Sequence, residues 1–243
     1  MVSAVASVDV LRQETGLDAD NGAALRATPT FTSFPSALDG DTTAAGSRAP
    51  FRIRTETEKV DPRNAVPAWA LDDGRPLVFI TFGTLAAGSP KYHELFRTAL
   101  EALATLPLRA LFSTGAEMDL ALLGAIPENV TVASWVPQSE VFPRAAALVC
   151  HGGAGTVIAG LANRLPMILT PLGADQPETA RRVEASGAGI ALSKPDATSL
   201  RAAVEKTLVD PDIRAASGRI AGEIAAMQSM DDAVSEIQRL NSN

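Results

Sequence analysis

The stretch most suited to chemistry lies past the middle of the chain, where an apolar run stops at a histidine. The run AALVC is followed by His151, then by Gly152, Gly153 and Gly155 within four residues, and then by Thr156. Glycines at a strand exit let backbone N–H groups approach an anion, and the next helix adds unpaired N–H groups and the positive end of its dipole. The histidine and the threonine can also donate to phosphate oxygens. A phosphate cradle fits, although a glycine cluster taken alone also fits a tight turn capped by the histidine.

Two further stretches offer other kinds of recognition chemistry. Trp135 begins the segment WVPQ directly after the apolar run NVTVAS, and its indole is a flat face on which a nucleobase can stack. Asp175 and Gln176 follow the run PMILTP after a short loop, and their carboxylate and amide suit sugar hydroxyls. Each has a structural alternative, because Trp135 fits a buried core or interface position, and Asp175 with Pro177 fits a helix start.

The elements that must position these residues are predicted by the pattern from Arg75 onward. Short apolar runs alternate there with helical stretches such as EMDLALLGAI, and after Thr198 the pattern is helical to the end. The apolar runs are PLVFITF, RALF, NVTVAS, AALVC, PMILTP and GIAL. This alternation predicts parallel strands, buried on both faces and joined by crossover helices. We therefore expect an open, doubly wound, Rossmann-like parallel α/β sheet from about Trp69, with ligands bound just after the strand ends.

The first 73 residues have a different texture. They are poor in periodic pattern and rich in Thr, Ala, Gly and Pro, with room for one or two short strands, for example at residues 51–55. A segment of this kind cannot build a core of its own. We therefore predict two parts, residues 1–73 and a domain of residues 74–243.

The overall composition excludes several classes of partner and site. The 243 residues are 46% hydrophobic, enough for a sizeable core, and the formal net charge of -7 disfavours nucleic acid and anionic membrane surfaces. Cys150 is the single cysteine, which excludes an internal disulfide and suits a reducing compartment. With His93 and His151 it cannot supply a common zinc site. The chain shows neither a signal-peptide pattern nor an apolar run of membrane-spanning length. We expect a cytoplasmic protein without a metal ion or cofactor.

Residues 135–192 carry a resemblance to a known family. Their W-x-P-Q … H-G-G-x-G-T … P … D-Q pattern resembles, in order and spacing, the donor-binding half of family 1 nucleotide-sugar glycosyltransferases, which have the GT-B fold. The spacing is similar to the bacterial branch that glycosylates macrolide, glycopeptide and other natural products. The likeness spans about residues 76–192 and, more loosely, the whole chain.

The resemblance implies a role for each residue that would bind the base or the sugar of a nucleotide-sugar donor. Trp135 would stack on the base of a UDP- or dTDP-sugar, the backbone of Val136 would read the edge of that base, and Gln138 would lie near the base or ribose. Asp175 and Gln176 would bind hydroxyls of the donor sugar.

The resemblance also implies how the diphosphate is held. His151 and the turn after it would bind the diphosphate, and Thr84, after the first strand, would approach from the other side. The residues of this turn are Gly152, Gly153, Gly155 and Thr156. These donors would stabilise the leaving diphosphate without a metal ion.

Three positions depart from the family pattern. Ala159 stands where many relatives have a ribose-binding glutamate, which favours a deoxyribose donor. Arg144 stands where a histidine is common, and Arg164 where a glycine is common.

The resemblance further implies an acceptor-binding domain with a catalytic base, and residues 1–73 resemble only the tail of such a domain and its linker. His93 is expected on the surface of a helix, not as that base, so this chain is predicted to hold no catalytic residue. The implied function is the donor half of an inverting glycosyltransferase that moves a hexose to a hydroxyl of a small-molecule natural product, inactive alone.

Other functional assignments remain open. The chain could be one subunit of a two-chain enzyme, or a non-catalytic glycosyltransferase-like helper. A dinucleotide oxidoreductase is disfavoured because no G-x-G-x-x-G follows an early strand.

Overall fold

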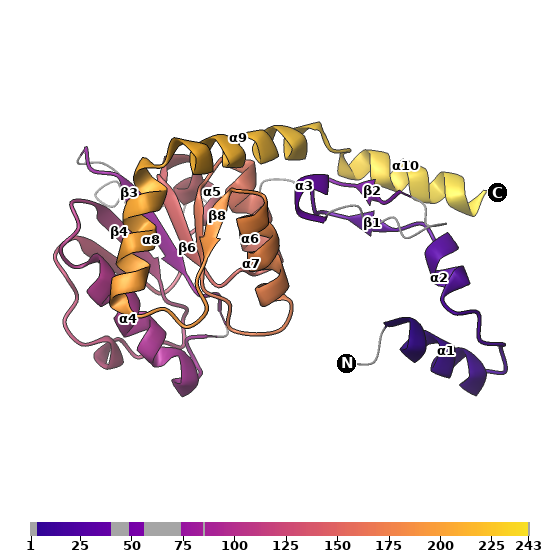
Figure 1. Ribbon diagram of the computed structural model, residues 1–243, viewed down its shortest axis with the longest axis horizontal. Helices are drawn as coiled ribbons and strands as arrows, with labels where there is room; N and C mark the ends of the chain where they lie inside the picture. The colour runs from indigo at the N-terminus through magenta and orange to yellow at the C-terminus, as the bar shows by residue number, and fades with distance from the viewer. Residues whose placement is uncertain (1–3, 40–48, 56–73, 85, 243) are drawn as a thin grey trace. The chain divides into compact units, whose positions relative to one another are not determined.

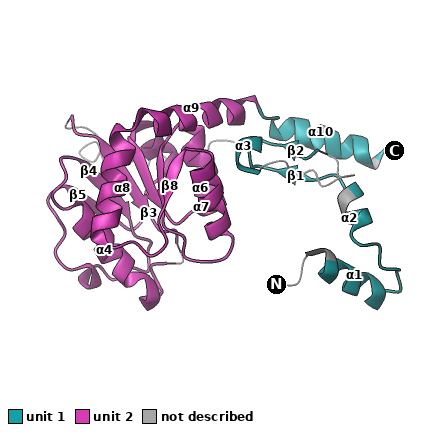
Figure 2. Cartoon of the chain, in the orientation of Figure 1, with its two compact units in different colours: residues 1–55, 227–243 teal, residues 56–226 magenta. Residues whose placement is uncertain are grey.

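The computed structural model describes residues 4–39, 49–55, 74–84 and 86–242. The chain forms two compact units, one of residues 1–55 with 227–243 and one of residues 56–226 (Figure 2). The predicted boundary at residue 73 lies outside the described residues. The units are therefore taken in turn, beginning with the larger.

The larger unit is built on a six-stranded, wholly parallel sheet with the strand order β5-β4-β3-β6-β7-β8 (Figure 1). Each strand coincides with one of the six apolar runs, which confirms the predicted α/β class. The bounds are β3 Leu77–Thr81, β4 Arg109–Ser113, β5 Val130–Ala133, β6 Ala147–Cys150, β7 Met167–Leu169 and β8 Gly189–Ala191. Strands β3, β6 and β7 are buried along their whole length, as expected of strands covered on both faces.

Helices cover both faces of this sheet, so the doubly wound arrangement is also confirmed. The bounds are α4 His93–Leu103, α5 Gln138–Val141, α6 Ala154–Ala162, α7 Gln176–Ala185, α8 Ala197–Val209 and α9 Pro211–Ala226. Helix α4 packs against α8, and α6 packs against α9. Val78 and Ile80 join the core cluster that α4 and α8 complete, whereas Phe79, which alternates with them, packs edge-on against Phe142.

One helical prediction is wrong. The stretch EMDLALLGAI forms only a short 3₁₀ helix, η4 (Leu120–Leu123). The Asp119 side chain accepts a hydrogen bond from the Ala121 N–H, and Gly124 has a φ of 76°. Four residues between this cap and a left-handed glycine are too few to sustain an α-helix.

The order of the strands reverses between β3 and β6. Strands β4 and β5 lie on one side of β3, and β7 and β8 lie beyond β6. In open α/β sheets, ligands bind outside the carboxyl ends of the strands at this kind of switch point. Residues that follow β3 and β6 are therefore placed where a ligand is expected.

The smaller unit joins both ends of the sequence. Its elements are α1 (Ala4–Glu14), α2 (Ala23–Ala27), β1 (Phe31–Thr32), α3 (Ser36–Asp39), β2 (Phe51–Arg52) and α10 (Met230–Asn241). Strands β1 and β2 pair in parallel, and Ile53 bridges to Gln228. Arg52 forms a 2.8 Å ion pair with Asp39, and Arg54 donates to the carbonyl of Met227 over 2.7 Å. These contacts tie the chain just before α10 to β2.

The strand expected at residues 51–55 forms only over Phe51–Arg52, as β2, and the sequence pattern did not predict α1. The apolar residues of this helix do not gather on one buried face, since Val10 and Leu11 are 53% and 59% exposed. In the described part of the chain, no helix has the length and apolar character needed to cross a membrane.

Candidate functional site

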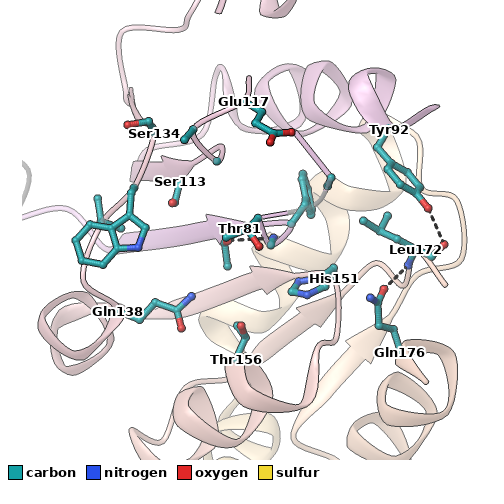
Figure 3. A pocket seen from close by; sticks show the side chains of 18 of the residues that line it. Thr81, Tyr92, Ser113, Glu117, Ser134, Gln138, His151, Thr156, Leu172 and Gln176 are labelled. Atoms are coloured by element: carbon teal, nitrogen blue, oxygen red, sulfur yellow. Dashed lines mark hydrogen bonds between the residues drawn. The ribbon is translucent and has the colours of Figure 1, made fainter. Parts of the chain in front are cut away.

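Five consecutive strand exits of the larger unit open into one cavity of about 740 Å³ (Figure 3). The exits belong to β5, β4, β3, β6 and β7, in their order along the sheet. Seven of the residues predicted from the sequence line the cavity: Thr84, Trp135, Val136, Gln138, His151, Thr156 and Gln176. Four do not line it: Gly152, Gly153, Gly155 and Asp175.

The His151 imidazole lies between two glycine backbones. A Cβ atom on Gly83 would come within 2.9 Å of the His151 Nε2 atom, and one on Gly153 within 2.5 Å. Gly83 also has a left-handed φ of 79°, which disfavours any side chain there. Because Gly83 follows β3 and Gly153 follows β6, the imidazole is placed at the switch point of the sheet. Both glycines serve its packing, which is the structural role considered for the turn; its binding role stays a prediction.

Burial governs the charge of this histidine. Desolvation lowers the pKa of His151 below its ordinary value, opposed by the backbone of Thr81 and by the negative charge of Asp175. The imidazole is therefore neutral at pH 7. Its Nδ1 atom is buried and has no hydrogen-bond partner among the described residues. A nearby anion would favour the protonated ring, in which both nitrogens donate.

Helix α6 begins shortly after His151 in the sequence, and its first turn lies at the cavity. Gly153 is the N-cap residue, and no side chain caps the helix. The first backbone N–H groups of an α-helix have no partner within it, and here they lie beside the cavity-lining Thr156. A Cβ atom on Gly155 would meet nothing within 4 Å. This helix end is suited to an anion.

At the β7 exit, the Gln176 side chain is already engaged. Its Oε1 atom accepts hydrogen bonds from the N–H groups of Leu172 (2.8 Å) and Gly173 (3.2 Å). The Tyr92 hydroxyl donates to the Leu172 carbonyl over 3.2 Å, so two side chains hold this turn from opposite ends (Figure 3). Gln176 was predicted to offer both a donor and an acceptor to a sugar. The carbonyl is occupied by the turn, and the amide NH₂ is the group left for a ligand.

Asp175 occupies the N-cap position of α7, but its side chain makes no capping hydrogen bond. It is exposed and lies outside the cavity lining. The predicted helix start is confirmed, because Asp175 is the N-cap residue of α7 and Pro177 lies in its first turn, although the carboxylate does not cap the helix. This carboxylate acts on the site electrostatically, because its negative charge opposes the lowering of the pKa of His151.

At the opposite end of the row of strand exits, Trp135 is 52% exposed. A core position for this tryptophan is therefore excluded. The loop is anchored by its neighbours, since Val136 is only 7% exposed and Pro137 is buried. Gln138 begins α5 and lines the cavity. The indole thus projects from a fixed loop and has surface available for stacking.

Sequence reasoning missed several polar residues that line the cavity. They are Thr81, Tyr92, Ser113, Glu117 and Ser134. Ser113 and Glu117 belong to the exit of β4, the run RALF, and applying the strand-exit rule to that run as well would have found them. Tyr92 carries no such signal, because it reaches the cavity from the 3₁₀ helix η3 (Pro90–Tyr92).

Residues 100–240 match the family model described as "Erythromycin biosynthesis protein CIII-like, C-terminal domain". The chain belongs to this family.

Curated relatives extend the likeness. The chain is 35% identical over 178 residues to 4'-demethylrebeccamycin synthase of Lentzea aerocolonigenes, which covers 72% of this chain and 41% of the relative. It is 32% identical over 205 residues to tylactone mycaminosyltransferase of Streptomyces fradiae, which covers 81% of this chain and 43% of the relative. The chain thus spans less than half the length of these relatives.

Solved structures show the same fold. The spinosyn rhamnosyltransferase SpnG superposes with a TM-score of 0.78 at 24% identity, over 95% of this chain and 60% of that one. A second structure of SpnG contains thymidine diphosphate. The calicheamicin glycosyltransferase CalG4 gives a TM-score of 0.75 at 23% identity, over 96% of this chain and 59% of the other. The resemblance to the C-terminal half of natural-product glycosyltransferases of GT-B fold is confirmed.

Against this family pattern, Arg164 has a clear structural meaning. Its φ is 62°, and it follows the C-cap Asn163 of α6. The Arg164 N–H donates to the Leu161 carbonyl and the Leu165 N–H to the Gly160 carbonyl, the pattern of a Schellman motif. A left-handed residue is needed there, which explains why glycine is common at this position.

The other departures lie away from the cavity lining. Ala159 is half-buried within α6, Arg144 is exposed, and neither lines the cavity. His93 is half-buried rather than on the surface, and its Nε2 atom lies 3.1 Å from the Ala87 carbonyl oxygen. Because Nε2 donates to this carbonyl, His93 fixes the loop after β3 and does not face the cavity lining.

Proposed function

We propose that this chain is the nucleotide-sugar-binding half of an inverting, metal-independent glycosyltransferase. It would bind a dTDP- or UDP-hexose, and the complete enzyme would move the hexose to a hydroxyl of a small-molecule natural product. The proposal is carried by the order of the strand exits. They present an aromatic face at β5, hydrogen-bond donors for an anion at β3 and β6, and an amide hydrogen-bond donor at β7. A nucleotide sugar has its base, diphosphate and sugar in this same order.

The chemistry asked of the chain is stabilisation of the leaving diphosphate. Negative charge develops on the β-phosphate as the bond to the sugar breaks, and fixed donors aimed at that charge lower the barrier. The donors proposed here are the first-turn N–H groups of α6, the Thr156 hydroxyl and the His151 imidazole. At the opposite end Trp135 would stack on the base, beside the backbone of Val136 and the side chain of Gln138.

Roles for the remaining predicted residues follow from their positions. Thr84 lines the cavity at the β3 exit and would meet the diphosphate from the side opposite α6. The Gln176 amide would donate to a hydroxyl of the sugar, and Asp175 would reach that sugar from the start of α7. Gly152, Gly153 and Gly155 would let the backbone approach the phosphates.

The names of two relatives and the ligand of one solved structure support this assignment. The relatives are named 4'-demethylrebeccamycin synthase and tylactone mycaminosyltransferase, and SpnG was solved in complex with thymidine diphosphate. The acceptor-binding site and the catalytic base would be supplied by a second domain, in the same chain or in a partner subunit, because the relatives are more than twice as long as the matched region.

A reconstituted enzyme tests the proposal. The chain is combined with the acceptor-binding half of a curated relative, and sugar transfer from dTDP- and UDP-hexoses is followed by chromatography, with the anomeric configuration read by NMR. We expect the combined halves to give product with inverted anomeric configuration, and neither half alone to transfer sugar. A chelator of divalent metal ions should not lower the rate. Transfer by the chain alone, retention of configuration or loss of activity with the chelator would each contradict a separate part of the proposal. A non-catalytic helper would bind nucleotide but give no transfer in any combination.

A further inference from the structure

Glu117 is an acidic side chain in a cavity proposed to bind an anion. It lies in the loop after β4 and lines the cavity, and it was not among the residues predicted from the sequence. Of the described residues in the lining, it is the one whose side chain carries a formal charge at neutral pH, since burial keeps His151 neutral. Its carboxylate forms no hydrogen bond or ion pair with the described part of the chain.

The position of this carboxylate is defined by glycines. A Cβ atom on Gly88 would lie 2.1 Å from the Glu117 Oε2 atom, so the carboxylate rests directly over the Gly88 backbone. The two loops also touch at Gly115, where a Cβ atom would come within 2.9 Å of the Ala87 Cβ. A side chain at Gly88 would displace the carboxylate from the edge of the cavity.

The sheet order places Glu117 relative to the other parts of the site. Along the sequence of strands β5-β4-β3-β6, the exits present Trp135, then Glu117, then Gly83, then His151. In this order along the sheet, Glu117 thus lies between the indole of Trp135 and the groups that could donate hydrogen bonds to an anion. In Figure 3 it lies on the side of the pocket opposite Thr156.

The chemistry of a carboxylate restricts what can lie beside it. An ionised carboxylate is an acceptor only, and a phosphate group next to it would be repelled. The part of a nucleoside diphosphate that lies between base and phosphates is the ribose, which carries a hydroxyl donor at its 3′ position.

We propose that Glu117 accepts the hydrogen bond from the 3′-hydroxyl of the nucleotide's ribose or deoxyribose, which makes it the residue that recognises this ring. The inference rests on the proposed function and specifies the donor more closely.

A comparison of two ligands with two proteins tests the inference. Isothermal titration calorimetry measures the affinity of the unmodified chain and of Glu117→Ala for dTDP and for 3′-deoxy-dTDP. A hydrogen bond to a charged acceptor corresponds to roughly tenfold or more in affinity. We expect the unmodified chain to lose about tenfold when the 3′-hydroxyl is removed, and Glu117→Ala to bind both nucleotides alike.

Glu128→Ala is the matched control, because Glu128 is an exposed acid outside the cavity lining and its removal changes the net charge equally. It should keep the tenfold difference. Glu117→Gln, which retains the shape of the side chain, should keep a smaller difference and excludes misfolding as the cause.

Two results would overturn the inference. An equal loss on removal of the 3′-hydroxyl in the unmodified chain and in Glu117→Ala would show that the carboxylate does not meet this group. Tighter binding of both nucleotides by Glu117→Ala, but not by Glu128→Ala, would show that the carboxylate only repels the phosphates. If the unmodified chain does not bind dTDP at all, the proposed function itself fails before any variant is measured.

Discussion

The two ends of the cavity differ in how firmly their side chains are held. At the end proposed to bind the diphosphate, called the phosphate end, which comprises Gly83, His151 and Thr156, the imidazole is packed between the backbones of Gly83 and Gly153. At the end proposed to bind the base, called the base end, which comprises Trp135, Val136 and Gln138, the indole is 52% exposed. A group already fixed in the empty protein loses little entropy on binding, whereas an exposed side chain must be ordered by its ligand. The phosphate end is therefore expected to give selectivity, and the base end to give affinity shared by every ligand that carries a base.

The largest effects should come from removing one side chain at each end. His151→Ala should weaken dTDP binding by about 10–150-fold, the equivalent of about 1.5–3 kcal/mol for a hydrogen bond to a charged group, and should leave thymidine binding unchanged. Trp135→Ala should weaken both ligands by the same factor, since stacking on a base is worth about 1–3 kcal/mol. Calorimetry with the two ligands measures both variants. Equal losses of the two ligands in His151→Ala would remove the distinction between the ends.

Two glycines of one turn give a sharper test of the phosphate end. Gly153→Ala places a Cβ atom 2.5 Å from the His151 Nε2 atom, whereas Gly155→Ala places one in open space. We expect Gly153→Ala to displace the imidazole and to weaken dTDP binding by roughly tenfold, close to the lower estimate for loss of its hydrogen bond. Gly155→Ala leaves the imidazole in place, because its Cβ atom meets no protein atom within 4 Å, so it should weaken dTDP binding less than Gly153→Ala does. If the two variants bind dTDP equally well, the imidazole position does not depend on Gly153.

Ligand binding at the phosphate end should take up a proton, whereas binding at the base end should not. Burial lowers the pKa of His151 in the empty cavity, and a bound diphosphate raises it again by favouring the charged ring. Binding then takes up a proton, so dTDP affinity should rise as the pH falls between the pKa of His151 in the complex and its lower pKa in the empty protein. The rise should be less than about tenfold per pH unit.

Thymidine carries no phosphate, and its binding should not depend on pH in this range. His151→Ala serves as the control for dTDP, because it retains the titration of the ligand's own phosphate. A pH dependence identical in this variant and in the unmodified chain would assign the proton to the ligand.

These expectations rest partly on sequence and partly on the fold. The six strands were predictable because each is a continuous apolar run, and the phosphate end because a histidine and three glycines follow one of them. Glu117 follows the run RALF and could have been found with the same strand-exit rule, but its residue type alone does not distinguish it from an acid in an ordinary solvent-exposed loop. Tyr92 meets Leu172 across 80 residues, a contact that only the assembled sheet creates.

The sequence pattern also could not predict the local hydrogen bonds and backbone angles that fix turns and helix ends. The pattern indicated that Gln176 could both donate and accept, and only the backbone of Leu172 and Gly173 reveals that its carbonyl is occupied. The helix expected over EMDLALLGAI failed because a capped turn ended at the left-handed Gly124. In both cases the deciding interaction is a hydrogen bond or a backbone angle that residue types alone do not specify.

The smallest effect is expected at the far end of α6, away from the phosphate end. Arg164→Gly should stabilise the protein by about 1 kcal/mol, because a non-glycine residue in the left-handed region is strained by roughly that amount. Gly187, with a φ of 79°, ends α7 in the same hydrogen-bond pattern, so Gly187→Ala should destabilise by a similar amount. Thermal or denaturant unfolding measures both, and dTDP affinity should not change in Arg164→Gly. A change in that affinity would mean that the two ends of α6 are coupled.

The central claim is that the row of strand exits forms a nucleotide-sugar site, and direct titration of the unmodified chain tests it. Calorimetry compares dTDP with thymidine under the same conditions. The account predicts one dTDP bound per chain, at least about tenfold more tightly than thymidine, because the phosphate end contributes hydrogen bonds that the nucleoside cannot make. An absence of binding at millimolar dTDP, or equal affinity for dTDP and thymidine, would contradict it.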